Sequence, residues 1–420
     1  MTGTEAGRGS LSTLVTTSTV TPPAAPVRTE PQRSTHVWWA IVALALGGFA
    51  IGTTEFVTMG LLPDIAASID RSIPTTGHLI TAYAFGVVVG APLIVSLGAK
   101  LPKRELAIVL VLGLAVGNGL TALASGYLPV MVSRFIAGLP HGAYFGVASL
   151  LAAAMVPPSM KGRAVSRVMM GLSVGTVAGV PLSAWLGQQL GWRAAYALVV
   201  VLAIATAVMI RAFVARVPGT PDATIGRELA ALRRPQVLLA VAAGMIGFGG
   251  VFAMYSYIAP IVTDVSELSR ATIPWVLFAF GVGSVAGTWL GGVLADWNNV
   301  RQLVAGFLVS VAALIVFYFA ATSGPVMIAL VFLVGALGSV LAIGLQLRLM
   351  HAAGDAQMLG AALNHSSLNV ANGLGAWLGG LVIAAGYGYA APSLVGAALA
   401  AVGLVIVLAA VAAERRQLSR

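Results

Sequence analysis

The stretch VWWAIVALALGGFAIGTTEFVTMGLL, residues 37–62, is almost wholly apolar, yet it contains one glutamate, Glu55. A helix needs about 20 apolar residues to cross the hydrocarbon core of a bilayer, and this stretch is long enough to span one. An ionisable side chain inside such a helix costs about 3 kcal/mol, so it faces a cavity or a partner more often than lipid. The stretch therefore predicts a membrane-spanning helix whose carboxylate has a task or a partner.

The composition of the whole chain agrees with this prediction. Hydrophobic residues make up 59% and charged residues 9%, with a mean hydropathy of +0.96, whereas a soluble domain carries about 25% charged residues. The net charge of +10 does not indicate a nucleic-acid partner, because the basic residues are scattered among short connections and do not gather on one soluble face. The absence of cysteine excludes disulfides and thiolate sites.

Eleven further apolar segments follow the first, with boundaries uncertain by a few residues. They are residues 76–99, 105–125, 128–155, 165–190, 194–216, 237–262, 272–295, 301–321, 325–350, 357–384 and 390–413. The one long polar connection divides them six and six. We therefore expect a first half at 37–216, a linker at 217–236, a second half at 237–413, a disordered tail at 1–36 that lacks the apolar core of a signal peptide, and a short tail at 414–420.

The basic residues also predict the orientation of the chain in the membrane. With the N-terminus in the cytoplasm, only Arg71, Arg193 and Arg270 fall outside and Arg134 lies within a helix, which leaves 19 of the 23 Lys and Arg inside. Cytoplasmic loops carry an excess of these residues. Both termini are therefore expected on the cytoplasmic side.

Two short matches indicate an internal repeat. AFGV occurs at 84–87 and again at 279–282, and AWLG occurs at 184–187 and again at 376–379. Each match falls on the segment six further along, at offsets of 195 and 192. Two six-helix halves in parallel orientation are the pattern of major facilitator transporters.

Three longer motifs resemble the same family: GTTEFVTMGLLPDIA at 52–66, SRFIAGLPHGAYFG at 133–146 and GTVAGVPLSAWLG at 175–187. The chain resembles the major facilitator superfamily over residues 37–413, and within it the bacterial twelve-helix drug:proton antiporters near the arabinose or sugar-efflux and chloramphenicol-resistance exporters. The resemblance implies an all-α membrane protein with twelve transmembrane helices in two pseudo-symmetric halves. It also implies a place in the bacterial inner (plasma) membrane.

The resemblance also implies gating residues. The family's gating loop keeps Gly292, Leu294 and Asp296 in the second half, whereas the first-half loop GAKLPKREL, residues 98–106, lacks the aspartate. A charge latch is therefore expected on Asp296, while Lys103 and Arg104 are expected to bind helix C-terminal carbonyls or anionic lipid heads.

Glycines in the fifth segment match the glycine-proline motif of the antiporters, except that the proline follows the last glycine after Val180. Gly171, Gly175 and Gly179 recur every four residues and form a ridge on which a neighbouring helix can pack and the halves can rock. Pro181 adds a bend.

Proton coupling is assigned to Glu55, Arg134 and His141. Glu55 is seven residues from Leu62 and Arg134 six from Leu128, so both lie on the order of 10 Å below the outer surface and an ion pair is possible. The pair is either a fixed salt bridge that holds two helices together, or a carboxylate whose proton affinity depends on its neighbours. His141 either relays protons or is bonded to a backbone carbonyl.

Substrate binding is assigned to aromatic and polar side chains at similar depth, although such side chains also serve as packing and interface residues. The aromatic candidates are Phe56, Tyr83, Phe145, Tyr255 and Tyr257. The polar candidates are His365 and Asn369, which share one face with Asn372 and either contact substrate or hydrogen-bond between the halves.

The chain lacks the metalloprotease, P-loop and nucleophile-elbow motifs, so we expect neither an enzyme nor an ATP-driven pump. We expect a monomer that needs no metal or other cofactor beyond a proton gradient, and whose partners are a small organic substrate, protons and membrane lipids. The predicted function is proton-coupled efflux of a drug, such as a chloramphenicol-like compound, or of a sugar. The alternatives are a facilitator or importer of a sugar or nucleoside, and a membrane sensor or scaffold that transports nothing.

Overall fold

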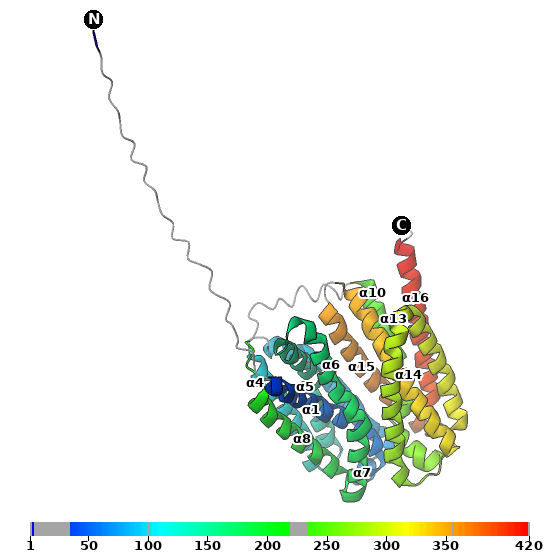
Figure 1. Cartoon of the computed structure of the whole chain (residues 1–420). Helices are drawn as coiled ribbons and strands as arrows, with labels where there is room; N and C mark the ends of the chain where they lie inside the picture. Colours follow the sequence, from blue (N-terminus) through cyan, green and yellow to red (C-terminus); the bar gives the residue numbers. More distant parts are fainter. Residues whose placement is uncertain (1, 4–33, 99–100, 219–233, 355–356, 419–420) are drawn as a thin grey trace.

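The computed structural model describes residues 2–3, 34–98, 101–218, 234–354 and 357–418. The described part is helical, and Figure 1 shows it as two bundles side by side, the first half of the chain in blue to green and the second half in yellow to red. Most of the predicted tail and linker, together with Lys100, lies outside the described residues. The all-α class predicted from the sequence is confirmed.

The first bundle contains eight α-helices and two short helical turns among the described residues. The α-helices are α1 (Ser34–Gly60), α2 (Leu62–Ser68), α3 (Ile73–Gly98), α4 (Lys103–Leu123), α5 (Tyr127–Ala154), α6 (Lys161–Val174), α7 (Val180–Leu190) and α8 (Trp192–Phe213). The turns are η1 (Pro158–Met160) and the π-helical turn η2 (Gly175–Gly179). Gly126 and Gly191, with φ of 83° and 88°, precede α5 and α8, since glycine tolerates the positive φ that a tight turn requires.

The second bundle repeats this plan with more interruptions. It contains α10 (Pro235–Ala242), the π-helical turn η3 (Ala243–Gly247), α11 (Gly249–Tyr255), α12 (Ile258–Pro260), the π-helical turn η4 (Ile261–Val265), η5 (Arg270–Thr272), α13 (Ile273–Ala320), α14 (Gly324–Ala353), α15 (Gln357–Ala384) and α16 (Pro392–Leu418). Proline occupies the first turn of α10, α13 and α14, where its missing N–H costs no helical hydrogen bond.

Eleven helices in the described part are long and apolar enough to cross a membrane. One of them, Arg270–Ala320, has 51 residues, about twice what one crossing requires. Its backbone leaves the helical conformation at Asn298, where φ is −166° and ψ is 104°. It therefore contains both the eighth and the ninth predicted segments, and the eleven helices are compatible with twelve crossings.

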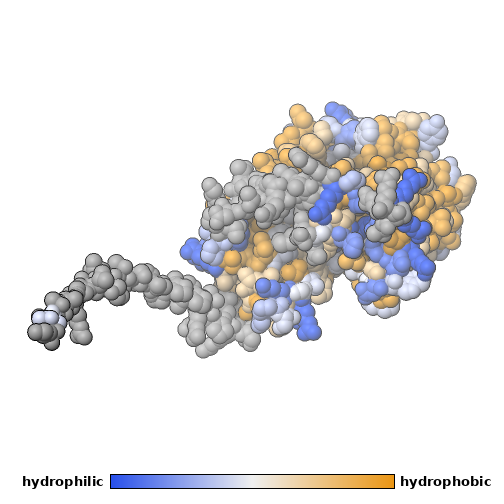
Figure 2. Space-filling model, turned by 90° about the horizontal axis from the view of Figure 1, so that it is seen from above, coloured by the Kyte–Doolittle hydropathy of each residue, from blue (hydrophilic) through white to orange (hydrophobic). Residues whose placement is uncertain are grey.

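The outer surface of the bundle is suited to lipid. Large apolar side chains such as Trp275, Trp289, Phe319 and Leu123 are exposed. In Figure 2 hydrophobic residues cover much of the sides, while hydrophilic residues gather on the end that faces the viewer. Charged and polar groups thus concentrate where the helices leave the membrane. We call this end, where α1 begins and α16 ends, the terminal end, and the opposite end, which holds α2 and η5, the distal end.

Glycine contacts establish how the two halves correspond. A methyl group added to Gly86, Gly90 or Gly138 would collide with the carbonyl oxygens of Phe135, Leu139 and Tyr83, where α3 packs on α5. In the second half, α13 packs on α14 with the same collisions at Gly283, Gly287 and Gly335, against Phe332, Ala336 and Phe280. Every one of these six positions lies 197 residues after its counterpart.

A second set of close contacts relates α1, α6 and η2 of the first half to α11 and α15 of the second half. Gly171 and Gly175 approach the carbonyl oxygens of Ala45 and Phe49 on α1, and Gly375 and Gly379 approach those of Gly249 and Ala253 on α11, an offset of 204. The AFGV and AWLG matches, at 195 and 192, are therefore out of register and do not mark equivalent positions. The halves do repeat, but backbone contacts and not these tetrapeptides define the register.

Candidate functional site

The candidate site begins at Glu55, near the middle of α1. Glu55 is 7% exposed and is the only carboxylate among the described residues that is classed with the buried polar groups. None of the four ion pairs in the described part includes it. Its charge state can therefore change without breaking a salt bridge.

Arg134 reaches α1 at the residue before Glu55. Its guanidinium donates to the side-chain and backbone oxygens of Thr54, at 3.0 and 2.9 Å, and it lies 4.4 Å from the ring centre of Tyr83 and 5.2 Å from that of Tyr196. Arg134 has no exposed surface. The arginine is thus held by neutral oxygens and aromatic faces, and the fixed salt bridge to Glu55 that the sequence allowed is not formed in this conformation.

Thr54 connects this arginine to a third helix. Its hydroxyl donates to Asn118 Oδ1 on α4 at 2.5 Å, and Asn118 Nδ2 donates to the carbonyl of Leu114 at 2.8 Å. Sequence reasoning missed both residues. The available signal was the polar run of Thr53, Thr54 and Glu55 inside an apolar segment, together with a lone asparagine in the third segment.

A row of rings leads from Arg134 across the boundary between the halves. The Tyr83 hydroxyl and His141 Nδ1 are hydrogen-bonded at 3.1 Å. The ring centre of Phe145 lies 5.5 Å from that of His141 and 6.0 Å from that of His365, with the last two rings nearly parallel at 8°. The structure therefore brings together four predicted site residues from α3, α5 and α15.

A second aromatic group lies where α1 faces α11. The ring of Phe56 is 6.2 Å from both Phe252 and Tyr255, and Tyr255 stacks on Phe280 at 3.7 Å. The Tyr255 hydroxyl is buried and has no hydrogen-bond partner. Phe56 and Tyr255 thus form a contact between the halves that carries one unused polar atom.

Two other predicted binding residues have their polar groups occupied, wholly or in part. The Tyr257 hydroxyl donates to the carbonyl of Ala376 at 2.6 Å. Asn369 Nδ2 donates to the carbonyl of His365 at 3.0 Å, while its Oδ1 has no partner. Tyr257 also lies against Gly77 of α3, so its position fits a structural link between the halves.

The distal end is closed between the halves. Arg270 of η5 pairs with Asp64 of α2, and Gln188 Nε2 of α7 donates to the Arg270 carbonyl at 2.9 Å. Thr81 of α3 donates to the carbonyl of Gly373 of α15 at 3.1 Å. We call Asp64, Arg270 and Gln188 the distal latch.

The predicted gating residues at the terminal end take different positions. Asp296 is exposed and belongs to none of the ion pairs of the described part. Arg104 binds Glu105 at 3.0 Å and the carbonyl of Val214, the residue that follows the end of α8, at 3.4 Å. Lys103 is buried, with its backbone N–H on the carbonyl of Val217. In this conformation the second-half latch is not engaged.

The predicted glycine ridge packs on α1. Gly171 and Gly175 approach the carbonyl oxygens of Ala45 and Phe49, and Gly179 approaches the hydroxyl of Thr53. The ridge continues through the π-helical turn η2, and Pro181 follows in the first turn of α7. A π-helical turn inserts an extra residue and bends the helix, so the bend begins before the proline.

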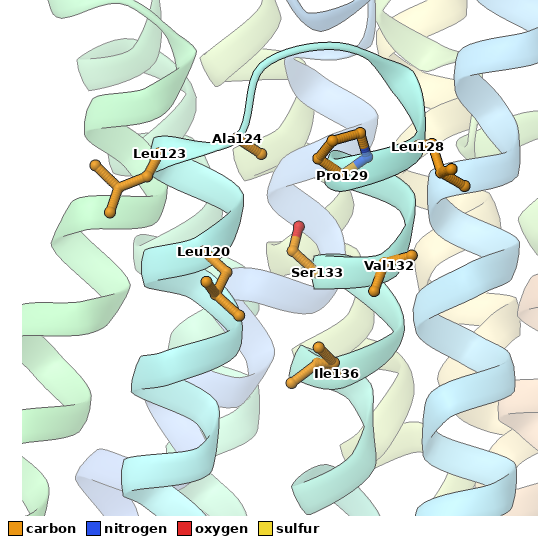
Figure 3. Close-up of a pocket in the computed structure, with 8 residues that line it drawn as sticks. All are labelled: Leu120, Leu123, Ala124, Leu128, Pro129, Val132, Ser133 and Ile136. Carbon is orange, nitrogen blue, oxygen red and sulfur yellow. The ribbon is translucent and has the colours of Figure 1, made fainter.

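A surface pocket lies away from this site. It has a volume of about 410 Å³ and is lined by α4 and α5, with Leu120, Leu123, Leu128 and Val132 exposed along it. Figure 3 shows these apolar side chains around a single hydroxyl, that of Ser133, which is already bonded to the Val130 carbonyl at 2.7 Å. This groove faces the lipid side and has no unused polar group for a solute. The described residues contain no cluster of metal ligands.

Comparison with known proteins adds three findings. The model of the Major Facilitator Superfamily matches residues 44–363. The chain is 38% identical over 373 residues to the inner membrane transport protein YdhP of Escherichia coli strain K12, which covers 88% of this chain and 95% of that protein. It is 35% identical over 358 residues to a chloramphenicol resistance protein of Streptomyces lividans, covering 84% and 90%.

Among solved structures, a D-xylose-proton symporter is similar with a TM-score of 0.69 and 16% identity, covering 89% of this chain and 97% of that one. At this identity the likeness concerns the fold alone. It confirms the predicted fold of two helical halves.

Proposed function

As a member of the Major Facilitator Superfamily, this chain is a multi-pass membrane protein and a secondary transporter, not an enzyme, and we propose that it exports a small organic solute in exchange for protons. The observation that carries the proposal is the environment of Glu55. It is a buried carboxylate without an ion pair among the described residues, and it follows Thr54, the residue whose two oxygens bind Arg134. Such a carboxylate can change its protonation state without breaking a salt bridge.

In the proposed exchange the terminal end and the distal end of the protein open alternately. With both termini in the cytoplasm, the closed distal end faces outward, and we assign the access to Glu55 in this conformation to the cytoplasmic side. Solute entering there displaces the proton from Glu55, and Arg134 and His141 rearrange with it. After the halves rock, the distal latch opens, solute leaves and Glu55 takes a proton from outside. Asp296 then engages the latch at the terminal end.

The solute is proposed to be a chloramphenicol-like drug or a sugar. Similarity to the Streptomyces lividans chloramphenicol resistance protein over most of both chains supports the drug. The aromatic groups around Phe56 and Phe145 suit a solute with an apolar body. The alternative within transport is a facilitator or importer, which would share the fold and the site but not the direction.

Proteoliposomes with an imposed pH gradient test the proposal. Solute flux should run against the proton flux, and collapsing the gradient with an ionophore should stop net accumulation. Flux in the direction of the protons, or flux indifferent to the gradient, would refute exchange and favour the importer or the facilitator. Deletion of residues 1–33 should leave the flux unchanged, whereas a scaffold that docks a partner through this tail would lose its role.

The distal latch gives a prediction of its own. Reversing the charge in Arg270→Glu places two carboxylates together and should favour the state that is open at the distal end. Exposed ion pairs contribute about 0.2–1 kcal/mol, so the population should shift by a factor of about 1.4 to 5. Since the chain has no cysteine, a cysteine introduced at buried Met59 can be labelled with an impermeant maleimide, and labelling should accelerate accordingly.

The double variant Asp64→Arg with Arg270→Glu restores opposite charges and should return the labelling rate to that of the parent. Arg71 lies at the same end, and its guanidinium donates to the carbonyl of the neighbouring Asp70, so Arg71→Glu serves as the control for a change of charge there. Equal labelling in Arg270→Glu and Arg71→Glu would show that the latch does not hold the distal end closed.

A further inference from the structure

Three fully buried side chains of the second half, those of Tyr255, Ser256 and Asn372, leave all of their side-chain hydrogen-bonding atoms unused. We consider the two larger ones, the hydroxyl of Tyr255 and both amide atoms of Asn372, because each belongs to a residue in contact with the boundary between the halves. Buried polar atoms in folded proteins are hydrogen-bonded in the large majority of cases. Leaving one unpaired carries the full cost of removing it from water. Three unused atoms at two positions therefore require an explanation.

Both side chains belong to faces that meet the first half. The ring of Tyr255 lies 6.2 Å from that of Phe56 on α1. Asn372 follows His365 by seven residues, which places both on one face of α15, and His365 stacks on Phe145 of α5. The next residue, Gly373, accepts a hydrogen bond from Thr81 of α3. Alternating access opens and closes this boundary, so a solute bound between the halves can reach both groups.

The charges around this boundary select against cationic solutes. The acidic residues described in the second half are Asp264, Glu267, Asp296 and Glu414, and none of them is buried. Among the described residues of the first half Glu55 is the one buried acid, and in the proposed exchange it carries the proton. The buried Arg134 repels a cation from the same region. No second carboxylate among the described residues is placed to neutralise a positive solute.

We infer that Tyr255 and Asn372 bind an uncharged solute that carries both hydrogen-bond donors and acceptors, such as hydroxyls or an amide, on an aromatic or apolar body. The inference rests on the proposed transport function and names the class of its substrate. An asparagine amide offers a donor and an acceptor side by side, and a tyrosine hydroxyl adds one of either kind. A solute with several hydroxyl or amide groups satisfies these atoms, whereas a quaternary or aromatic cation leaves them unpaired.

Binding to the purified protein in detergent tests this inference without any gradient. The probes are chloramphenicol, which is uncharged and has two hydroxyls and an amide, and ethidium, an aromatic cation. The variants are Asn372→Leu and Tyr255→Phe, which keep size and remove polarity. We expect wild type to bind chloramphenicol more tightly than ethidium, and each variant to bind chloramphenicol about tenfold more weakly. The melting temperature of the empty variants should stay the same or rise, because an unpaired polar group is lost.

Two matched controls separate binding from folding. Tyr144→Phe removes a buried hydroxyl that is satisfied by the Leu44 carbonyl at 2.8 Å, so it should lower the melting temperature and keep the affinity. Ser310→Ala removes an unpartnered buried hydroxyl from the later part of α13 and should also keep the affinity. A wild-type preference for ethidium, failure of wild type to bind chloramphenicol, or unchanged affinity in both variants overturns the inference. The inference is also overturned if Asn372→Leu lowers the melting temperature as much as Tyr144→Phe does.

The two proposals fail in different ways. Wild type that binds chloramphenicol with the expected variant effects, but moves it without regard to the pH gradient, refutes proton exchange and supports the substrate class. The opposite result is also possible: Glu55→Gln loses pH-driven flux, while Asn372→Leu and Tyr255→Phe bind chloramphenicol as tightly as wild type. That result supports proton exchange and refutes the substrate class.

Discussion

Replacing Glu55 by glutamine is expected to abolish solute accumulation driven by a pH gradient while leaving the protein folded. The amide has the shape of the protonated acid and cannot release a proton, so the halves can rock with solute but cannot exchange it for protons. Because Glu55 has no ion pair with a described residue, the change leaves no arginine newly unpaired. The melting temperature should therefore remain close to that of wild type.

Two transport assays in proteoliposomes check this expectation. Accumulation under an imposed gradient should fall to the level of liposomes without a gradient, whereas exchange of labelled for unlabelled solute should continue. Glu414→Gln is the matched control, since this glutamate pairs with Arg348 at 2.7 Å near the end of α16 and should be dispensable for coupling. If Glu55→Gln still accumulated solute against its gradient, Glu55 would not be the proton carrier.

The second large effect concerns a close backbone contact between α3 and α5. Gly138→Val is expected to destabilise the fold severely, because the new side chain collides with the Tyr83 carbonyl and α3 must move away from α5. Overpacking a core typically costs about 1–3 kcal/mol, and a collision with backbone cannot be relieved by a rotamer change. The displaced Tyr83 would also lose its place against Arg134. Thermal unfolding in detergent should show the loss.

Two other variants make this test specific. Gly146 lies on the same helix with open space where a side chain would go, so Gly146→Val should be tolerated. Gly335 is the counterpart of Gly138 at the offset of 197, and Gly335→Val should be as harmful as Gly138→Val. Tolerance of Gly335→Val would show that the two halves do not share this packing.

The sequence predicted the membrane class and the helical fold because hydropathy and segment length determine both. It also placed Glu55 and Arg134 at one depth, and the structure brings Arg134 to Thr54, the neighbour of Glu55. Counting residues along a helix gives depth, but it does not give the partner of a long side chain. Thr54 offers two oxygens to the guanidinium, and that choice depends on how α1 is rotated against α5.

Contacts between residues far apart in the chain could not be predicted from the sequence. Asp64 and Arg270 belong to different halves, and only their position outside the apolar segments was visible. The repeat was inferred from tetrapeptides that share composition but not structural position, because glycine and alanine recur throughout membrane helices. The true register depends on which glycine faces a neighbouring backbone, and that cannot be read from a single chain.

Among the described residues the second half has no buried carboxylate equivalent to Glu55, and this has an electrical consequence. The positions equivalent to Glu55 and Arg134, at offsets of 204 and 197, are Ala259 and Val331, which carry no charge. One buried acid among the described residues allows one proton per cycle, and exchange of one proton for an uncharged solute moves a net charge across the membrane. A potential of 100 mV then contributes about 2.3 kcal/mol, or roughly a 50-fold concentration ratio. The cell's voltage, as well as its pH gradient, would thus drive the transporter.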